Sequence, residues 1–232
     1  MRTGRTALGI ATVLATLLLV APQASAQTAP TCNLPESDAD ALVILNAFYP
    51  NRYIWEDTDL TVTVRAAPNV GAEYREAVED AIATWGEVID RCFDGAITVS
   101  LAPDERSADI VVHYVPHAGG AVFAGYAICG ANGCPNILVR SDFATGLGGE
   151  DYTADYLFYV ALHELGHALG LGHATNITES TDLMGYGWVG DAPDPLFSQC
   201  DIDALAYVFS WALEGTEAPG PGPGSLEPTF EC

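Results

Sequence analysis

The feature that most constrains this chain is a pair of histidines four residues apart, His163 and His167, in a run of small and apolar residues. On a helix, residues four apart lie on the same face one turn from each other, so both imidazoles can reach one metal ion. Glu164 is next to the first histidine and points in a different direction. Two neutral imidazoles suit zinc, and the neighbouring carboxylate is then free to act as a base on a water molecule.

A third histidine, His173, follows six residues after His167. It cannot join the pair from the same helix, because six residues advance a helix by about 9 Å while zinc–nitrogen bonds are about 2.1 Å long. The chain must therefore turn back, and Gly170 stands where this turn is needed, since glycine adopts the left-handed conformation that ends helices. Three histidines leave one coordination position for water, which is typical of catalytic zinc sites.

The complete spacing over 163–173, His-Glu-x-x-His-x-x-Gly-x-x-His, resembles the signature of the metzincin zinc proteases. That family places a methionine in a turn after the third histidine, and Met184 is the only methionine besides Met1. The resemblance implies one catalytic zinc held by the three histidines, with Glu164 as the catalytic base. It implies structural roles for Met184 and Gly170.

The elements predicted around this motif form an α/β (α+β) arrangement. Residues 60–65 alternate as in a strand, and apolar residues recur at helical spacing over 72–89. Further strands are predicted before the helix that carries the motif, over 96–101, 108–114, 121–128 and 137–140. We therefore expect a mixed twisted sheet packed on two long helices, with a third helix near the C-terminus.

This order of elements resembles the catalytic domain of the matrixins, the matrix metalloproteinase-like branch of the metzincins, over about residues 53–211. Ala108-Asp109-Ile110 before a strand, Trp85 in the first helix and the segment 197–205 are similar to matrixin landmarks. In the last segment, Ser198 is a good N-cap and Asp201 supplies an acidic group in the first helical turn. The resemblance implies the metzincin (zincin) fold.

Tyr186 departs from the usual matrixin pattern. A tyrosine two residues after the turn methionine is similar to the astacin and serralysin pattern, where it can approach the zinc or the oxyanion. Its phenol could donate a hydrogen bond to a developing tetrahedral oxyanion, which would make Tyr186 a catalytic residue. Alternatively, it lines the substrate pocket together with Trp188.

Further metal sites are less well defined by the sequence. The resemblance implies a calcium site, and hard oxygen ligands are available, although no EF-hand spacing is present; the candidates are Asp142, Glu150, Asp151 and Asp155. His113 and His117 raise the question of a second zinc, but the additional histidine and aspartate ligands that matrixins supply downstream are missing. We therefore expect these two histidines to be structural or surface residues.

The chain divides into four predicted parts. Residues 1–26 have the features of a secretory signal peptide: Arg2 and Arg5, an apolar run and an Ala-Ser-Ala cleavage site. An N-terminal segment, 27–52, precedes the catalytic domain, 53–214, and a Pro/Gly-rich tail occupies 215–232. We therefore expect a secreted, extracellular protein that is a monomer and is not membrane-bound.

The strong negative charge limits the possible partners. The chain has 31 acidic and 8 basic residues, a net charge of −23, and every basic residue is arginine. Such a surface repels nucleic acid and anionic membranes. It is either a solubilising acidic coat or an adaptation to high salt, where a Debye length of about 3 Å in molar salt relieves the self-repulsion.

Six cysteines in an exported chain favour three disulfides, for which about 15 connectivities exist. Only one pair can be predicted, because Cys129 and Cys134 bracket the turn-like Gly-Ala-Asn-Gly. Cys32 lies in a segment that faintly resembles the matrixin propeptide, whose thiolate binds the zinc. The segment lacks the propeptide arginine, so we expect Cys32 in a disulfide.

The implied activity is endoproteolysis of a protein or peptide substrate that binds in extended form, with the strand over 121–128 pairing with it. Glu164 would take a proton from the attacking water and deliver it to the leaving amine. The alternative is a non-catalytic secreted zinc-binding or adhesion module on the same scaffold.

Overall fold

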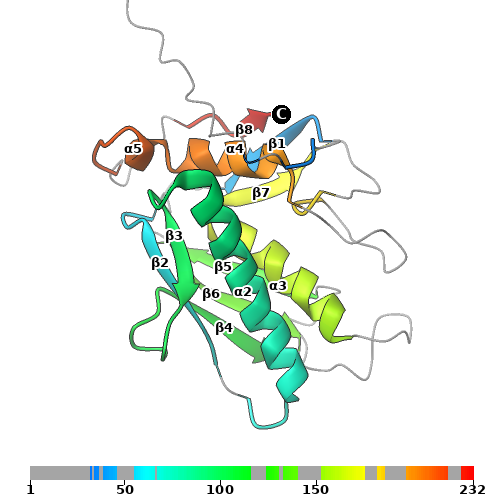
Figure 1. Cartoon of the computed structure of the whole chain (residues 1–232). Coiled ribbons are helices and arrows are strands. Elements are labelled where there is room, and N and C mark those ends of the chain that lie inside the picture. The colour runs from blue at the N-terminus through cyan, green and yellow to red at the C-terminus, as the bar shows by residue number, and fades with distance from the viewer. Residues whose placement is uncertain are drawn as a thin grey trace, which may run out of the picture.

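The computed structural model describes residues 32, 34–36, 39–45, 55–65, 67–115, 124–130, 133–140, 153–175, 182–185, 197–218 and 226–232. Two long helices, α2 (Ala72–Phe93) and α3 (Ala154–Ala168), lie side by side across one face of a sheet (Figure 1). A shorter helix, α4 (Gln199–Val208), crosses one end of this pair, followed by α5 (Ser210–Leu213). This architecture confirms the expected α/β fold.

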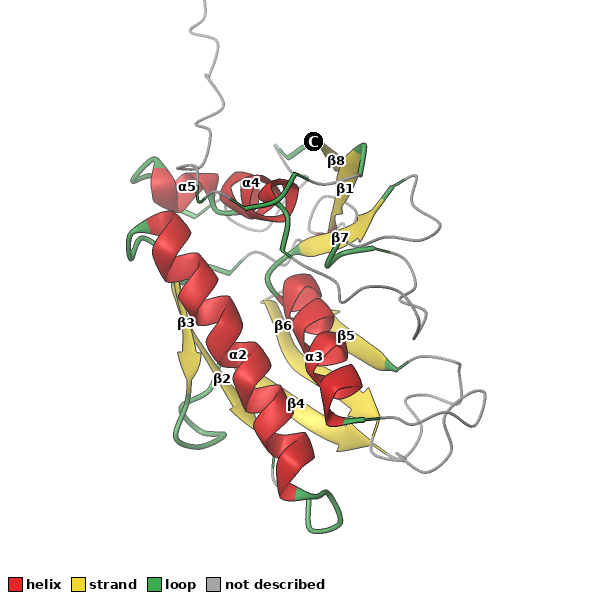
Figure 2. Ribbon diagram, turned by 45° about the vertical axis from the view of Figure 1, so that its right-hand side comes forward, coloured by secondary structure: helices red, strands yellow, loops and turns green. Residues whose placement is uncertain are grey.

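The larger sheet has five strands in the order β3-β2-β4-β6-β5. Its members are β2 (Asp59–Val64), β3 (Thr98–Leu101), β4 (Ile110–Val115), β5 (Gly125–Gly130) and β6 (Gly133–Arg140). Strands β3, β2, β4 and β6 run parallel to one another, and β5 runs antiparallel to β6. The sheet is therefore mixed, with β5 at the edge beside α3 (Figure 2).

The core lies between the sheet and the two long helices. Trp85 of α2 is fully buried, its indole N–H donates to the carbonyl of Leu162 at 2.8 Å, and its ring meets Phe197 edge-on with centroids 4.6 Å apart. This side chain thus ties α2 to α3 and to the start of α4. No helix within the described ranges is long and apolar enough to cross a membrane.

A second sheet, in the order β7-β1-β8, was not predicted from the sequence. It consists of β1 (Ala41–Ile44), β7 (Leu171–Ala174) and β8 (Thr229–Glu231), and β1 is antiparallel to both neighbours. Strands of three or four residues have almost no periodic signal, and these pair across more than 50 positions of sequence. The sheet joins segments near both ends of the chain to β7, the strand that contains His173.

Three disulfides connect the described elements. Cys129 is bonded to Cys134 across the β5–β6 turn, as predicted from the sequence. Cys32 is bonded to Cys92 near the end of α2, and Cys200 of α4 to Cys232 after β8. The last bond fixes the C-terminal strand to the helix that packs beside the second sheet.

Replacing both Cys200 and Cys232 with serine should lower the free energy of unfolding by about 3–4 kcal/mol, because the bond constrains an unfolded chain over a long loop. The two cysteines are 32 positions apart, against 5 for Cys129 and Cys134. The matched double serine variant of that shorter pair should lose only about 2 kcal/mol. Urea unfolding followed by tryptophan fluorescence checks both values, and equal losses or the reverse order would contradict the assignment.

Candidate metal centre

Helix α3 and strand β7 together place the three histidines of the motif. α3 begins at Thr153, whose hydroxyl accepts the N–H of Tyr156, and it carries His163 and His167 in its last turns. The chain then reverses at Gly170, which has a φ of +112°, where a residue with a Cβ would be strained. The reversal brings His173 back on β7, which confirms the turn predicted at this glycine.

The three imidazoles converge on one point. Their potential ligand nitrogens all lie within 4.8 Å of one another. The ring centroids are 4.5 Å apart for His163 and His167, 4.7 Å for His167 and His173, and 5.3 Å for His163 and His173. One ion can therefore be reached from all three side chains.

Backbone carbonyls orient two of these rings. Nδ1 of His163 lies 2.7 Å from the carbonyl oxygen of Leu183, and Nδ1 of His167 lies 2.8 Å from that of Leu171. Because a carbonyl only accepts, each Nδ1 carries the proton and each Nε2 offers its lone pair. Burial lowers the pKa of all three histidines, that of His173 to about 4, so the rings are neutral at pH 7. This donor set fits a zinc ion.

Glu164 is buried beside this cluster. Burial raises the pKa of its carboxyl to about 8, while the hydrogen bond from the Ala127 amide acts in the opposite direction. Its Oε2 has no hydrogen-bond partner among the residues that the structure describes. A Cβ at Gly125 would lie 2.5 Å from Cγ of Glu164, so the absent side chain at position 125 makes room for this carboxylate. Strand β5, at the edge of the sheet, thus positions the side chain of Glu164.

Met184, the predicted turn methionine, is fully buried. Its carbonyl accepts the N–H of Ala174, next to His173, and its own N–H donates to Oδ1 of Asp182 at 2.9 Å. A Cβ at Gly166 would collide with the Met184 sulfur. The turn therefore contacts both elements that carry the histidines.

Some predicted residues lie outside the described ranges. These are Tyr186, Trp188, His117, Asp142, Glu150 and Asp151. Asp155, the remaining calcium candidate, is in the first turn of α3. The calcium site therefore stays a prediction from the sequence.

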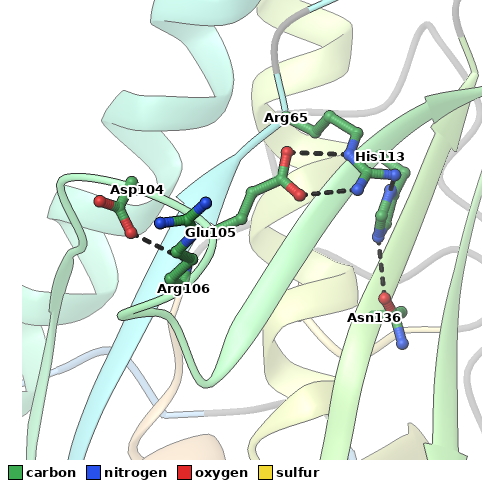
Figure 3. A network of polar contacts seen from close by, with 6 residues as sticks. All are labelled: Arg65, Asp104, Glu105, Arg106, His113 and Asn136. Carbon is green, nitrogen blue, oxygen red and sulfur yellow. Dashed lines mark hydrogen bonds and ion pairs between the residues drawn. The ribbon is translucent and has the colours of Figure 1, made fainter.

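His113 takes part in a polar network on the sheet (Figure 3). Its Nε2 lies 2.8 Å from Oδ1 of Asn136, and its Nδ1 lies 3.4 Å from the guanidinium of Arg65. Arg65 is also paired with Glu105 at 2.6 Å. Because both ring nitrogens have protein partners, the described contacts favour the structural histidine that the sequence predicted.

Several residues of this site carry no recognisable signal in the sequence. The carbonyls of Leu171 and Leu183 orient histidines, and Gly125 and Ala127 place Glu164. Backbone groups act here whatever the side chain is, so no residue type marks them. The glycine at position 125 was the one available signal, because a glycine inside a predicted strand often marks close approach of another group.

A family model described as matrixin matches residues 54–204, more than half of the chain. The chain belongs to the matrixin family. It is 27% identical over 207 residues to an interstitial collagenase of Bos taurus, covering 83% of this chain and 39% of the relative. It is 28% identical over 217 residues to a neutrophil collagenase of Homo sapiens, covering 87% and 42%. Matrix metalloproteinase-16 of Homo sapiens is 30% identical over 135 residues, covering 53% and 22%. This matrixin thus spans less than half the length of these relatives.

Gly166→Ala should destabilise this matrixin by about 1–3 kcal/mol, because the added methyl overpacks the contact between α3 and Met184. Thermal unfolding of the zinc-loaded protein should show a lower midpoint. The matched control is Ala83→Gly, which changes a methyl on the exposed side of α2 and should cost only about 1 kcal/mol. A Gly166→Ala protein as stable as the wild type would contradict the close packing of Met184 on α3.

Proposed function

We propose that this matrixin is a secreted zinc-dependent endopeptidase. The observation that carries the proposal is the convergence of three neutral imidazoles beside a buried glutamate. His163, His167 and His173 would hold the ion through their lone-pair nitrogens. When bound, zinc supplies a Lewis acid that polarises a carbonyl and makes water a stronger acid.

Glu164 is the proposed general base. Its carboxylate is buried next to His163 in the sequence, and Oε2 is free of hydrogen bonds within the described chain. As a carboxylate it would accept a proton from the attacking water, and burial, which raises the pKa of this carboxyl, helps it hold that proton until it is returned to the leaving amine. The Ala127 amide and the space at Gly125 keep the carboxylate in place during both transfers.

We propose that the substrate binds as an added strand along β5. Among the described strands β5 pairs only with β6, so its other edge is unpaired within the described chain. The same strand positions Glu164, so a peptide pairing there would pass beside the catalytic base. Main-chain pairing selects extended polypeptide and carries little sequence information, which favours endoproteolysis of proteins or peptides.

Other parts of the proposal rest on the sequence. Tyr186, two residues after Met184, would donate a hydrogen bond to the oxyanion, and residues 1–26 would direct secretion and be removed. We propose a monomer that binds neither nucleic acid nor membranes, with an acidic surface suited to high salt. Calcium would bind through oxygen ligands of the acidic side chains that the sequence offers, Asp142, Glu150, Asp151 and Asp155.

Glu164→Ala should abolish most activity without removing the metal. We expect casein cleavage to fall by about 10²–10⁴-fold while zinc content stays at the wild-type value, because Glu164 moves a proton and is not a ligand. Glu87→Ala, on the exposed face of α2, is the matched control and should leave cleavage unchanged. A chelator should stop the wild-type enzyme. Equal activity in Glu164→Ala would exclude Glu164 as the base, and a zinc-loaded wild type that cleaves neither casein nor peptides would exclude the peptidase.

A further inference from the structure

Two buried carboxyl groups meet behind the turn that carries Met184. Asp182 belongs to the turn itself and is 5% exposed, while Asp201 lies in the first turn of α4 and is fully buried. The pairing is unusual, because two carboxylates adjacent in an apolar interior repel each other and lose their hydration.

The hydrogen bonds of Asp201 leave one of its oxygens for Asp182. Oδ2 accepts the N–H of Ser198 at 2.8 Å, and the N–H of Asp201 donates to the Ser198 hydroxyl at 3.1 Å, which completes a capping box. Oδ1 is buried and finds no donor among the described residues, and the carboxyl of Asp182 is the neighbouring acidic group that acts on this side chain. A bond between two carboxyl groups requires a proton on one of them. Burial, followed by the charge of Asp182, raises the pKa of Asp201 well above its ordinary value.

Asp182 connects the pair of carboxyl groups to the histidines. Oδ1 of Asp182 accepts the N–H of Met184 at 2.9 Å. Leu183 lies between Asp182 and Met184 in the sequence, and its carbonyl accepts Nδ1–H of His163 at 2.7 Å. The carbonyl of Met184 accepts the N–H of Ala174 at 2.8 Å. A shift of the turn relative to α4 would therefore move a group that orients His163.

We propose that Asp182 and Asp201 are positioning residues that share one proton, and that this carboxyl–carboxylate bond fixes the 182–185 turn to α4 and thereby orients His163. The inference rests on the proposed zinc site, since its consequence is the retention of the ion. Both side chains act through the Leu183 carbonyl and touch neither substrate nor reacting atoms. This bond requires one of the two side chains to donate a hydrogen and the other to accept it.

Asparagine substitutions test this requirement because they preserve shape. In Asp201→Asn the amide nitrogen donates to Asp182 and the amide oxygen still accepts from Ser198. In Asp182→Asn the amide oxygen still accepts from Met184 and the nitrogen donates to Asp201. In the double variant the two amide oxygens remain committed to their backbone partners, so two NH₂ groups face each other without an acceptor.

The measurement is the rate of zinc release to a chromogenic chelator for wild type, both single variants and the double variant. We expect each single variant to release zinc within about threefold of the wild type, and the double variant about tenfold faster than the product of the single effects predicts. The absorption spectrum of the cobalt-substituted protein should change only in the double variant. Asp203→Asn, also on α4, is the matched control and should match the wild type in both readouts.

The double variant alone could fail to fold, and this result would also support the shared proton. Side-chain volume is nearly the same in all four proteins, so the loss would come from the missing acceptor. Additive effects, or a single variant as damaging as the double, would overturn it. The thermal stabilities of the four metal-free proteins report on the bond without zinc. If the wild type binds no zinc, the proposed function fails while these stabilities still test the pair.

Discussion

The metal centre depends on holding three partly buried histidines as neutral rings that converge on one point. An imidazole in an apolar interior can adopt several orientations, and each wrong one leaves a polar nitrogen unsatisfied. The carbonyls of Leu183 and Leu171 remove this freedom for His163 and His167, because each accepts the Nδ1 proton at 2.7–2.8 Å. One of these carbonyls is in the methionine turn and the other in β7, so the geometry of the centre is set by the chain segments after α3.

Those segments are themselves held by structure far away in the sequence. β7 pairs with β1, β1 pairs with β8, and the Cys200–Cys232 bond ties the end of β8 to α4. The first turn of α4 in turn faces Asp182 through Asp201. Several polar side chains are thus buried around the site, where electrostatic interactions are strong and unsatisfied groups are costly. The second sheet, the Cys200–Cys232 bond and α4 thus hold the segment that carries His173 near α3, which carries the other two histidines and Glu164.

The sequence predicted the local part of this arrangement well. The four-residue spacing of His163 and His167, the reversal at Gly170 and the cap at Ser198 each follow from one short stretch and one backbone preference. The second sheet was not predicted, since its three strands are too short for periodicity and find each other only after the chain has folded. The burial of Asp182 and Asp201 was also missed, because a surface-charge argument places acidic residues in solvent.

The most direct test of the central claim is zinc K-edge X-ray absorption on the purified protein. Three imidazole nitrogens at about 2.0–2.1 Å with one further light ligand are predicted, because the fold brings one ring nitrogen each of His163, His167 and His173 to a common point. Sulfur in the coordination shell, fewer than three imidazoles, or a folded protein that retains no zinc would contradict the account.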